Sequence, residues 1–365
     1  MTSEITIKKN TSLEGIEKYW LHNLLENLVF NITQQSSFQL FVEGISLGYL
    51  EEIIKRGTTI SINLKYVKAV NEEEDFTGFP PILHSIFGLE LLHVCKCVYL
   101  DDGGKNKNWK SEIGNYVWKN VLNNAGSISS GKKVYLISRH GYEVPRRLRE
   151  DPAVINFPTL SFFKTAIYPL ILSMRGSKEL GFAETALIEW IHQIAENAYQ
   201  HGSMDNSKKT IDGYRGIYLQ KYILNNEVQR DEFPVKVQEY ITKVIKEKPW
   251  ESKKVIVNSA TVCDLGIGIQ NTLTSSAPSF DLLNSAFKDG VTQKNVGSKE
   301  AGYGLGQALN AAKNLQALLY VVSSNLVASL DLSIDTNNRT SPLKFEMELS
   351  KEHGTSISLV WLTVL

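Results

Sequence analysis

The sequence is poor in the residue types that mark specialised classes of protein. Of 365 residues, three are cysteine and ten are proline, and Lys plus Arg equals Asp plus Glu at 39 each. A small, odd number of cysteines in apolar surroundings argues against a disulfide framework or a metal cluster and favours core packing. The balanced charge provides no strong field that would draw the chain to nucleic acid or to an anionic membrane.

Long hydrophobic runs are also lacking. The chain continues with polar residues after Met1, which is not the pattern of a signal peptide, and its longest apolar run, near Ile167 to Met174, is too short to cross a bilayer. We therefore expect a cytoplasmic protein without membrane association. The hydrophobic content of 42% and the charged content of 21% are typical of a globular chain, and the length leaves room for two domains.

The pattern of apolar residues divides the chain at about residue 150. Residues 1–150 combine short β-rich segments with helical ones, which predicts a small α/β domain of unknown role. An aperiodic, proline-containing stretch from about Gly141 to Pro158 is the expected linker. In this first part we expect strands at 38–42, 59–64, 94–100 and 133–137, and helices at 47–56 and 118–123.

Residues 151–365 are expected to form a second domain, in which long helices precede a run of mostly adjacent strands. This order predicts an α/β sandwich with helices on one face of a mixed sheet. We expect helices at 160–174, interrupted at Pro169, and at 182–201, and an amphipathic helix at 235–246 within a surface insertion. Strands are expected at 216–219, 254–257 with 260–262, 317–322, 328–334, 345–349 and 355–362.

The helical pattern at 182–201 has a polar stripe beside its apolar one. Gln193, Asn197 and His201 are spaced by four and therefore share a face of the helix. An amide oxygen on such a helix suits a Mg²⁺ ion that phosphates also hold. His201, one turn further on, would then meet a phosphate oxygen. A merely solvated polar face is the alternative, and it is favoured for this helix taken alone.

Two glycine motifs follow this helix at long range. An apolar strand ends at Asp264, where a carboxylate can accept the exocyclic amino group of adenine and a residue without Cβ lets the base approach the backbone. The second motif runs into an apolar-periodic helix, whose first backbone amides can hold phosphate. A structural turn is the alternative for each motif by itself. The motif residues are Gly266, Gly268 and Ile269 in the first, and Gly302, Tyr303, Gly304, Leu305 and Gly306 in the second.

In this order the motifs resemble those of the GHKL superfamily, which comprises DNA gyrase, heat-shock chaperone ATPases, sensor histidine kinases and MutL-type mismatch repair proteins. The resemblance covers about half the chain, from roughly Phe182 to Leu365, and includes a late Gly354-Thr355. It implies a Bergerat α/β sandwich that binds magnesium-ATP, with the adenine at Asp264 and Thr355 behind it, and with Asn197 on the metal. It also implies a mobile lid over 270–301, in which Lys294, Ser298 and Lys299 are candidate phosphate contacts.

One position departs from the ATP-hydrolysing members of that superfamily. They carry a general-base Glu four residues before the asparagine, where this chain has Gln193, which cannot take a proton but can position a water. None of the seven histidines is followed by Glu, as the phosphoacceptor of histidine kinases commonly is. We therefore expect an ATP-binding regulatory protein with slow or no hydrolysis, whose closed lid signals to the amino-terminal domain or to a protein partner; a homodimer is compatible with this. A kinase of a separate protein and a non-catalytic nucleotide sensor are the alternatives.

Overall fold

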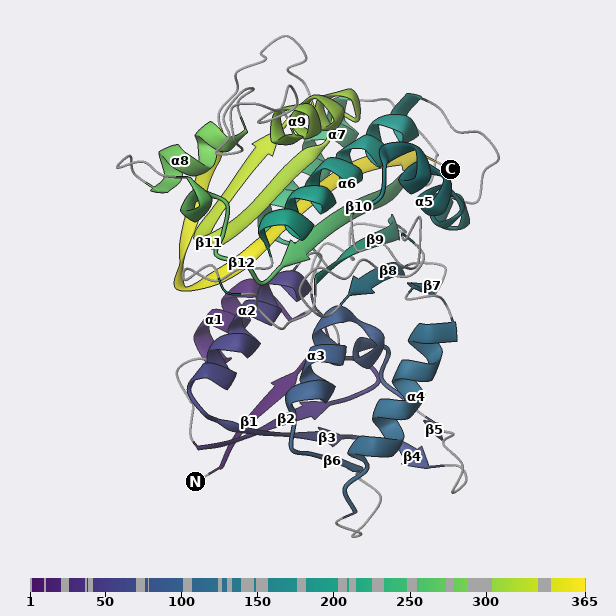
Figure 1. Ribbon diagram of the computed structural model, residues 1–365, viewed down its shortest axis with the longest axis vertical. Helices are drawn as coiled ribbons and strands as arrows, with labels where there is room; N and C mark the ends of the chain where they lie inside the picture. Colours follow the sequence, from purple (N-terminus) through teal and green to yellow (C-terminus); the bar gives the residue numbers. More distant parts are fainter. Residues whose placement is uncertain are drawn as a thin grey trace. The chain divides into compact units, whose positions relative to one another are not determined.

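The chain folds into two units, each with its own sheet (Figure 1). The first unit comprises Met1–Ile128 with Asp231–Pro234, and the second comprises Ser129–Arg230 with Val235–Leu365. The computed structural model describes residues 2–9, 11–20, 26–36, 38, 42–69, 76–77, 79–100, 107–123, 127–129, 133–138, 148, 157–175, 182–202, 209, 215–224, 233–247, 255–273, 279–287, 304–333 and 343–364.

The first unit contains a four-stranded parallel sheet in the order β1-β2-β3-β6. Alternate residues on one face, such as Ile5, Phe30 and Ile62, are buried apolar side chains. The other face is polar: Asn31 donates to Glu4 at 3.0 Å, and Asn63 donates to Asn31 at 3.2 Å. The period of two in burial therefore fixes which face each strand turns inward. The strands are β1 (Thr2–Ile7), β2 (Asn27–Ile32), β3 (Thr59–Leu64) and β6 (Cys97–Leu100).

The helices of this unit differ in part from the sequence prediction. Of the expected strand at 38–42, only the two ends are described: Phe38 makes an isolated bridge and packs against Trp20 and Phe87, and a helix instead of a strand begins at Val42. A short apolar run does not by itself distinguish a strand from a buried connection. The remaining elements are α1 (Leu13–Trp20), α2 (Val42–Lys55), η1 (Pro81–His84), α3 (Ile86–Val94), α4 (Lys110–Asn123), β4 (Lys68–Ala69) and β5 (Phe76–Thr77).

The second unit contains a six-stranded sheet in the order β11-β12-β10-β9-β8-β7. The pairs from β11 to β8 are all antiparallel, so the expectation of a mixed sheet is corrected for these strands. The strand at 133–138 pairs with β9 and belongs to this sheet, whereas the sequence placed it before the domain boundary. Strand pairing is non-local, and the local pattern of 133–137 carries no sign of its partner. The strands are β7 (Ser127–Ser129), β8 (Lys133–Ser138), β9 (Arg215–Leu224), β10 (Val255–Asp264), β11 (Leu318–Asp331) and β12 (Lys344–Val364).

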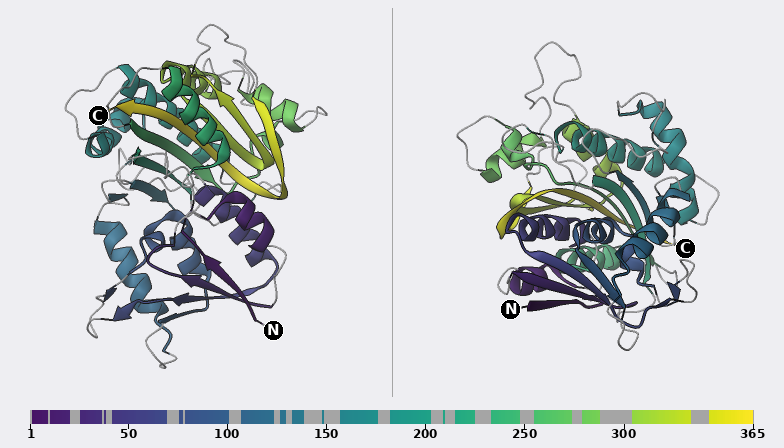
Figure 2. Two further views of the ribbon diagram at one scale, coloured as in Figure 1. Left: turned by 180° about the vertical axis from the view of Figure 1, so that it is seen from behind. Right: turned by 60° about the horizontal axis from the view of Figure 1, so that its bottom comes forward.

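Helices lie on both faces of this second sheet. Three of them, α5 (Leu160–Arg175), α6 (Phe182–His201) and α9 (Gly304–Asn314), cover one face, and their apolar side chains form one core with the strands (Figure 1). On the opposite face lies α7 (Val235–Glu247), which Figure 2 shows from behind. Tyr240 of α7 donates to the carbonyl of Gln316 at 2.8 Å, and Lys243 pairs with Asp331 at 2.7 Å. The expectation of helices on one face only is therefore corrected.

Helix α5 continues through Pro169, where the sequence predicted an interruption. The side chains of Ile167, Leu170 and Ile171 are buried in the core on both sides of the proline. Packing of this apolar face outweighs the backbone hydrogen bond that a proline removes. None of the helices in the described part of the chain combines the length and the apolar character that crossing a membrane requires.

Candidate functional site

A row of buried polar residues crosses four adjacent strands at one end of the second sheet. Asp264 of β10 pairs with Thr355 of β12, which in turn pairs with Ser323 of β11. On the other side, Cys263 pairs with Gly216, which places Arg215 next to Asp264. Residues that are paired across strands point to the same face, so all four members of the row face the helical layer of α6. We call Arg215, Asp264, Thr355 and Ser323 the polar row; none is more than 9% exposed.

Asp264 is the acidic residue of the polar row, and its surroundings shift the pKa of its carboxyl group. Its Oδ1 accepts the backbone N–H of Gly266 at 2.8 Å. Burial raises the pKa of Asp264 from its ordinary 3.8 to about 6, against the opposing effects of the backbone hydrogen bonds from Gly266 and Thr355 and of the Arg215 charge. The carboxyl group is therefore ionised at neutral pH but titrates within reach of it.

Three glycines from three separate segments enclose Asp264. A Cβ at Gly202, directly after α6, would collide with the Asp264 carboxyl carbon, and a Cβ at Gly354 of β12 would collide with the Asp264 carbonyl oxygen. A Cβ at Gly266 would lie 2.6 Å from Gly202 Cα. Contacts this short leave no room for any side chain. The end of α6, the first glycine motif and the Gly354-Thr355 segment therefore meet at one residue, Asp264.

The turn that follows Asp264 is held by the tip of β11. Gly268 has φ 87°, and a Cβ there would lie 2.8 Å from the Ser324 nitrogen. The N–H of Ile269 donates to Ser323 Oγ at 2.7 Å, and that hydroxyl donates to Gln270 Oε1 at 2.7 Å. The Gln270 amide nitrogen returns a bond to the Ser323 carbonyl at 3.0 Å. These hydrogen bonds join the turn of the first glycine motif to Ser323 of β11.

The tip itself arises because β11 doubles back. The N–H of Leu332 donates to the carbonyl of Ala317 at 2.9 Å, which joins the residues that flank the two ends of this strand. A straight strand would separate these two residues, 15 positions apart, by about 50 Å. Ser324 has φ 51°, the left-handed conformation that permits the reversal.

Part of the segment expected to form a lid, 270–301, is packed into the second unit. Gln270 is 2% exposed, and Leu283 and Phe287 belong to the core. These residues lie on η4 (Gln270–Thr272), on α8 (Ser279–Ala286) and just after it. The polar composition of 270–301 concealed this apolar anchor. The candidate phosphate contacts Lys294, Ser298 and Lys299 lie outside the described residues.

The polar stripe of α6 offers amides and no free carboxylate. Gln193 and Asn197 are partly buried, and neither side chain hydrogen-bonds to another residue in the described ranges. Glu196 accepts a hydrogen bond from Gln200 at 3.0 Å, and Glu189 is exposed. His201 ends the helix, and its side chain lies outside the described set. The described side chains of the stripe, Gln193 and Asn197, therefore offer amide oxygens that could bind a cation.

The second glycine motif is described only from Gly304 onward, where α9 begins. Leu305 packs against the core, and Gly306 is buried. Helix α9 packs along α6, which brings the motif onto the helical layer that carries Asn197. Gly302 and Tyr303 lie outside the described residues.

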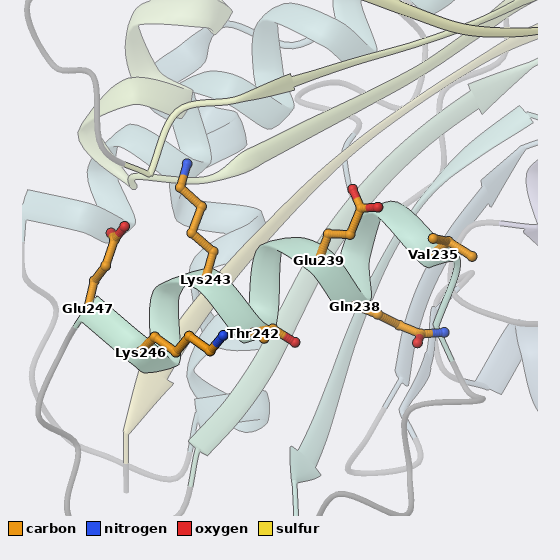
Figure 3. A pocket seen from close by; sticks show the side chains of 7 residues that line it. All are labelled: Val235, Gln238, Glu239, Thr242, Lys243, Lys246 and Glu247. Carbon is orange, nitrogen blue, oxygen red and sulfur yellow. The ribbon is translucent and has the colours of Figure 1, made fainter.

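The described part of the chain holds no clearer candidate site. It contains no cluster of three or more His, Cys, Asp or Glu residues that would hold a metal. A depression runs along α7, on the face opposite α6, and is lined by Val235, Gln238, Glu239, Thr242, Lys243, Lys246 and Glu247. Its side chains fan out from a single helix (Figure 3), and none of them is buried. Such a surface lacks the converging polar groups of a ligand site.

The sequence predicted Asp264, Gly266, Gly268 and Thr355, and the structure brings them together. Arg215, Ser323 and Gly202 were missed, although a glycine directly after the polar helix was a visible signal for the last. No protein-family model matches the chain, and no curated protein matches its sequence. The case for a function therefore rests on these residues.

Proposed function

We propose that the second unit is a variant of the Bergerat sandwich that binds magnesium-ATP, and that the protein is a cytoplasmic ATP-binding regulator. The bound nucleotide would signal to the first unit or to a protein partner. The observation that carries the proposal is the enclosure of Asp264 by Gly202, Gly266 and Gly354. Gly202 and Gly266 lie against its carboxyl group, and Gly354 lies against its backbone carbonyl.

Asp264 is suited to the amino group of adenine. A carboxylate has about four acceptor positions, so the backbone bonds from Gly266 and Thr355 leave capacity for a ligand donor. The glycines of the following turn, Gly266 and Gly268, place no side chain of their own beside this carboxyl group. The turn held by Ser323 and Gln270 needs no rearrangement to present them, which lowers the entropic cost of binding.

The magnesium ion and the phosphates would bind on the α6 side of the site. The half-buried Asn197 amide oxygen would be one ligand of Mg²⁺, with phosphates and water completing the shell of a cation that prefers octahedral oxygen coordination. The metal would neutralise phosphate charge. His201, Lys294, Ser298, Lys299 and the segment from Gly302 to Gly306 are the proposed phosphate contacts.

Slow or absent hydrolysis follows from the acids that are available. Gln193 can orient a water but not deprotonate it, Glu196 is bonded to Gln200, and Glu189 is exposed. The same arrangement supports a non-catalytic nucleotide sensor as the nearest alternative. Steady-state turnover measured beside binding separates the two.

The test is calorimetry of the full chain with ATP, with magnesium and with a chelator, joined to amide hydrogen exchange that locates the ligand. We expect binding that magnesium strengthens, with new protection at residues 264–270 and at the last turn of α6. The α7 depression is an internal control, since its amides should not change. Absent binding, or protection confined to α7, would contradict the proposal.

A further inference from the structure

Arg215 is a buried cation at the end of the polar row. It is the first residue of β9 and is 3% exposed. Its guanidinium carbon lies 4.7 Å from the centre of the Tyr199 ring. Tyr199 is on α6, two residues after Asn197, and is itself 5% exposed. A guanidinium over an aromatic face at this distance is a cation–π contact, which is stronger when it is desolvated.

Arg215 is also a neighbour of Asp264 in the sheet, because the adjacent residues Cys263 and Gly216 pair across β9 and β10. Its positive charge opposes the effect of burial on the pKa of that carboxyl group. The other groups packed on Asp264 are Gly202 from α6, Gly266 from its own turn, and Gly354 and Thr355 from β12, and none of them carries charge. Among the described residues, Arg215 is therefore the charged partner of Asp264. A buried acid requires such a partner to remain ionised.

We propose that Arg215 is a positioning residue of the candidate nucleotide site, which links the last turns of α6 to the end of β10 by contacting Tyr199 with its guanidinium and facing Asp264 with its charge. The proposal rests on the proposed function for its ligand. It assigns Arg215 two effects: it sustains the acceptor form of the carboxyl group, and it fixes that group against the helix that carries Asn197. Arginine suits both because its planar group stacks and its charge is permanent.

The test compares Arg215→Gln with wild type over pH 5.5 to 8.5, by NMR titration of the Asp264 carboxyl group and by ATP calorimetry. Removing an opposite charge at short range raises a carboxyl pKa by about one or more. With the wild-type pKa at about 6, half of the Asp264 groups are ionised at pH 6, against about a tenth in the variant. ATP affinity should then fall about fivefold at pH 6 and stay within about 1.2-fold of wild type at pH 8.

Lys221→Gln is the matched control, because it removes a positive charge from the same strand about 20 Å away. It should leave both profiles at their wild-type values. Arg215→Lys retains the charge without the planar group, so it should keep the Asp264 titration near wild type and lose part of the affinity at every pH. Tyr199→Leu removes the ring and should shift the titration in the same direction as Arg215→Gln, which keeps the test open if the glutamine variant fails to fold.

A purely structural role for Arg215 predicts a different result. Arg215→Gln and Tyr199→Leu would then lower the unfolding midpoint but leave the Asp264 titration and the shape of the affinity profile unchanged, which would overturn the proposal. The NMR titration needs no nucleotide. If the wild type fails to bind ATP while the titration shifts as expected, the proposed function fails and the pairing of Arg215 with Asp264 stands. If the titration does not shift while the wild type binds ATP, the pairing fails and the proposed function stands.

Discussion

Gly202, the residue after α6, lies so close to the Asp264 carboxyl group that a Cβ would collide with it. The same Cβ would lie 2.6 Å from the carbonyl oxygen of Ala198, one helical turn earlier. The end of the helix is therefore packed directly on the Asp264 side chain at the end of β10, and a change in one displaces the other. This contact makes the position of Asn197 relative to Asp264 a property of the fold.

Gly202→Ala should destabilise the second unit by about 1–3 kcal/mol, because the added methyl group forces the end of α6 away from Asp264. ATP affinity should fall with it. Denaturant unfolding and calorimetry measure the two effects. Gly114→Ala is the control: Gly114 lies inside α4 with nothing within 4 Å of a built Cβ, so alanine there should stabilise by about 0.5–1 kcal/mol. If Gly202→Ala changed neither the stability nor the ATP affinity, the end of α6 would be able to move away from Asp264 at no cost.

Asp264→Asn should weaken ATP binding at least tenfold. The amide replaces one acceptor oxygen with a donor, and a hydrogen bond to a charged group contributes about 1.5–3 kcal/mol. Asp281→Asn, on the exposed side of α8, makes the same chemical change away from the polar row. Calorimetry on both folded variants decides the matter, and unchanged affinity in Asp264→Asn would remove this residue from the adenine site.

Asn197→Ala should abolish the magnesium dependence of nucleotide affinity and leave the fold intact. The side chain is partly buried and has no hydrogen-bond partner among the described residues, so its removal costs little stability. The measurement is ATP affinity with magnesium and with a chelator, in variant and wild type. Continued tightening by magnesium in the variant would place the ion elsewhere.

Gln193→Glu should raise the rate of ATP turnover, which we propose to be slow in the wild type. Residue 193 lies one turn before Asn197 on the same face of α6, so a carboxylate there reaches a water near the terminal phosphate. General-base assistance contributes about 10²–10⁴-fold when well aligned. If Gln193 instead orients the water by hydrogen bonding, the rate stays flat or falls. A single-turnover assay separates these outcomes, and a fast wild type that the substitution slows would contradict the slow-regulator proposal.

The stability of the second unit should decrease as pH rises from about 4 to about 6. The pKa of Asp264 is raised by burial from 3.8 to about 6, so in this range the folded state binds the proton that the unfolded state has released. The contribution of Asp264 to the free energy of unfolding is fully present below the pKa of the unfolded state and is lost as pH rises through the pKa of the folded state. It amounts to roughly 3 kcal/mol. Unfolding of Asp264→Asn, compared with wild type across this window, isolates it. Parallel pH profiles would show that Asp264 titrates normally.

The local sequence predicted α6 and the position of Asp264 at a strand end, whereas α1, α3, α8 and β2 were not predicted. The bounds of α6 and of β3 match the predicted ranges. Apolar residues recur every 3.6 positions in a helix and every two in a strand, so both patterns can be recognised in a short stretch of sequence. Strand β1 was missed, since only its second half alternates polar and apolar residues. Asp264 was recognised because a carboxylate at a strand end before Gly266 is itself a local pattern.

Tertiary structure alone decided which residues surround Asp264. Ser323 and Arg215 lie on strands far apart in the sequence, and only the antiparallel register of four strands aligns them with it. It also decided that β8 joins the second sheet and that α5 continues through Pro169. The physical reason is the same throughout. Strand pairing and burial are interactions between segments far apart in the chain, so a short stretch of sequence does not reveal them. Helix periodicity and turn formation depend on neighbouring residues and can therefore be predicted locally.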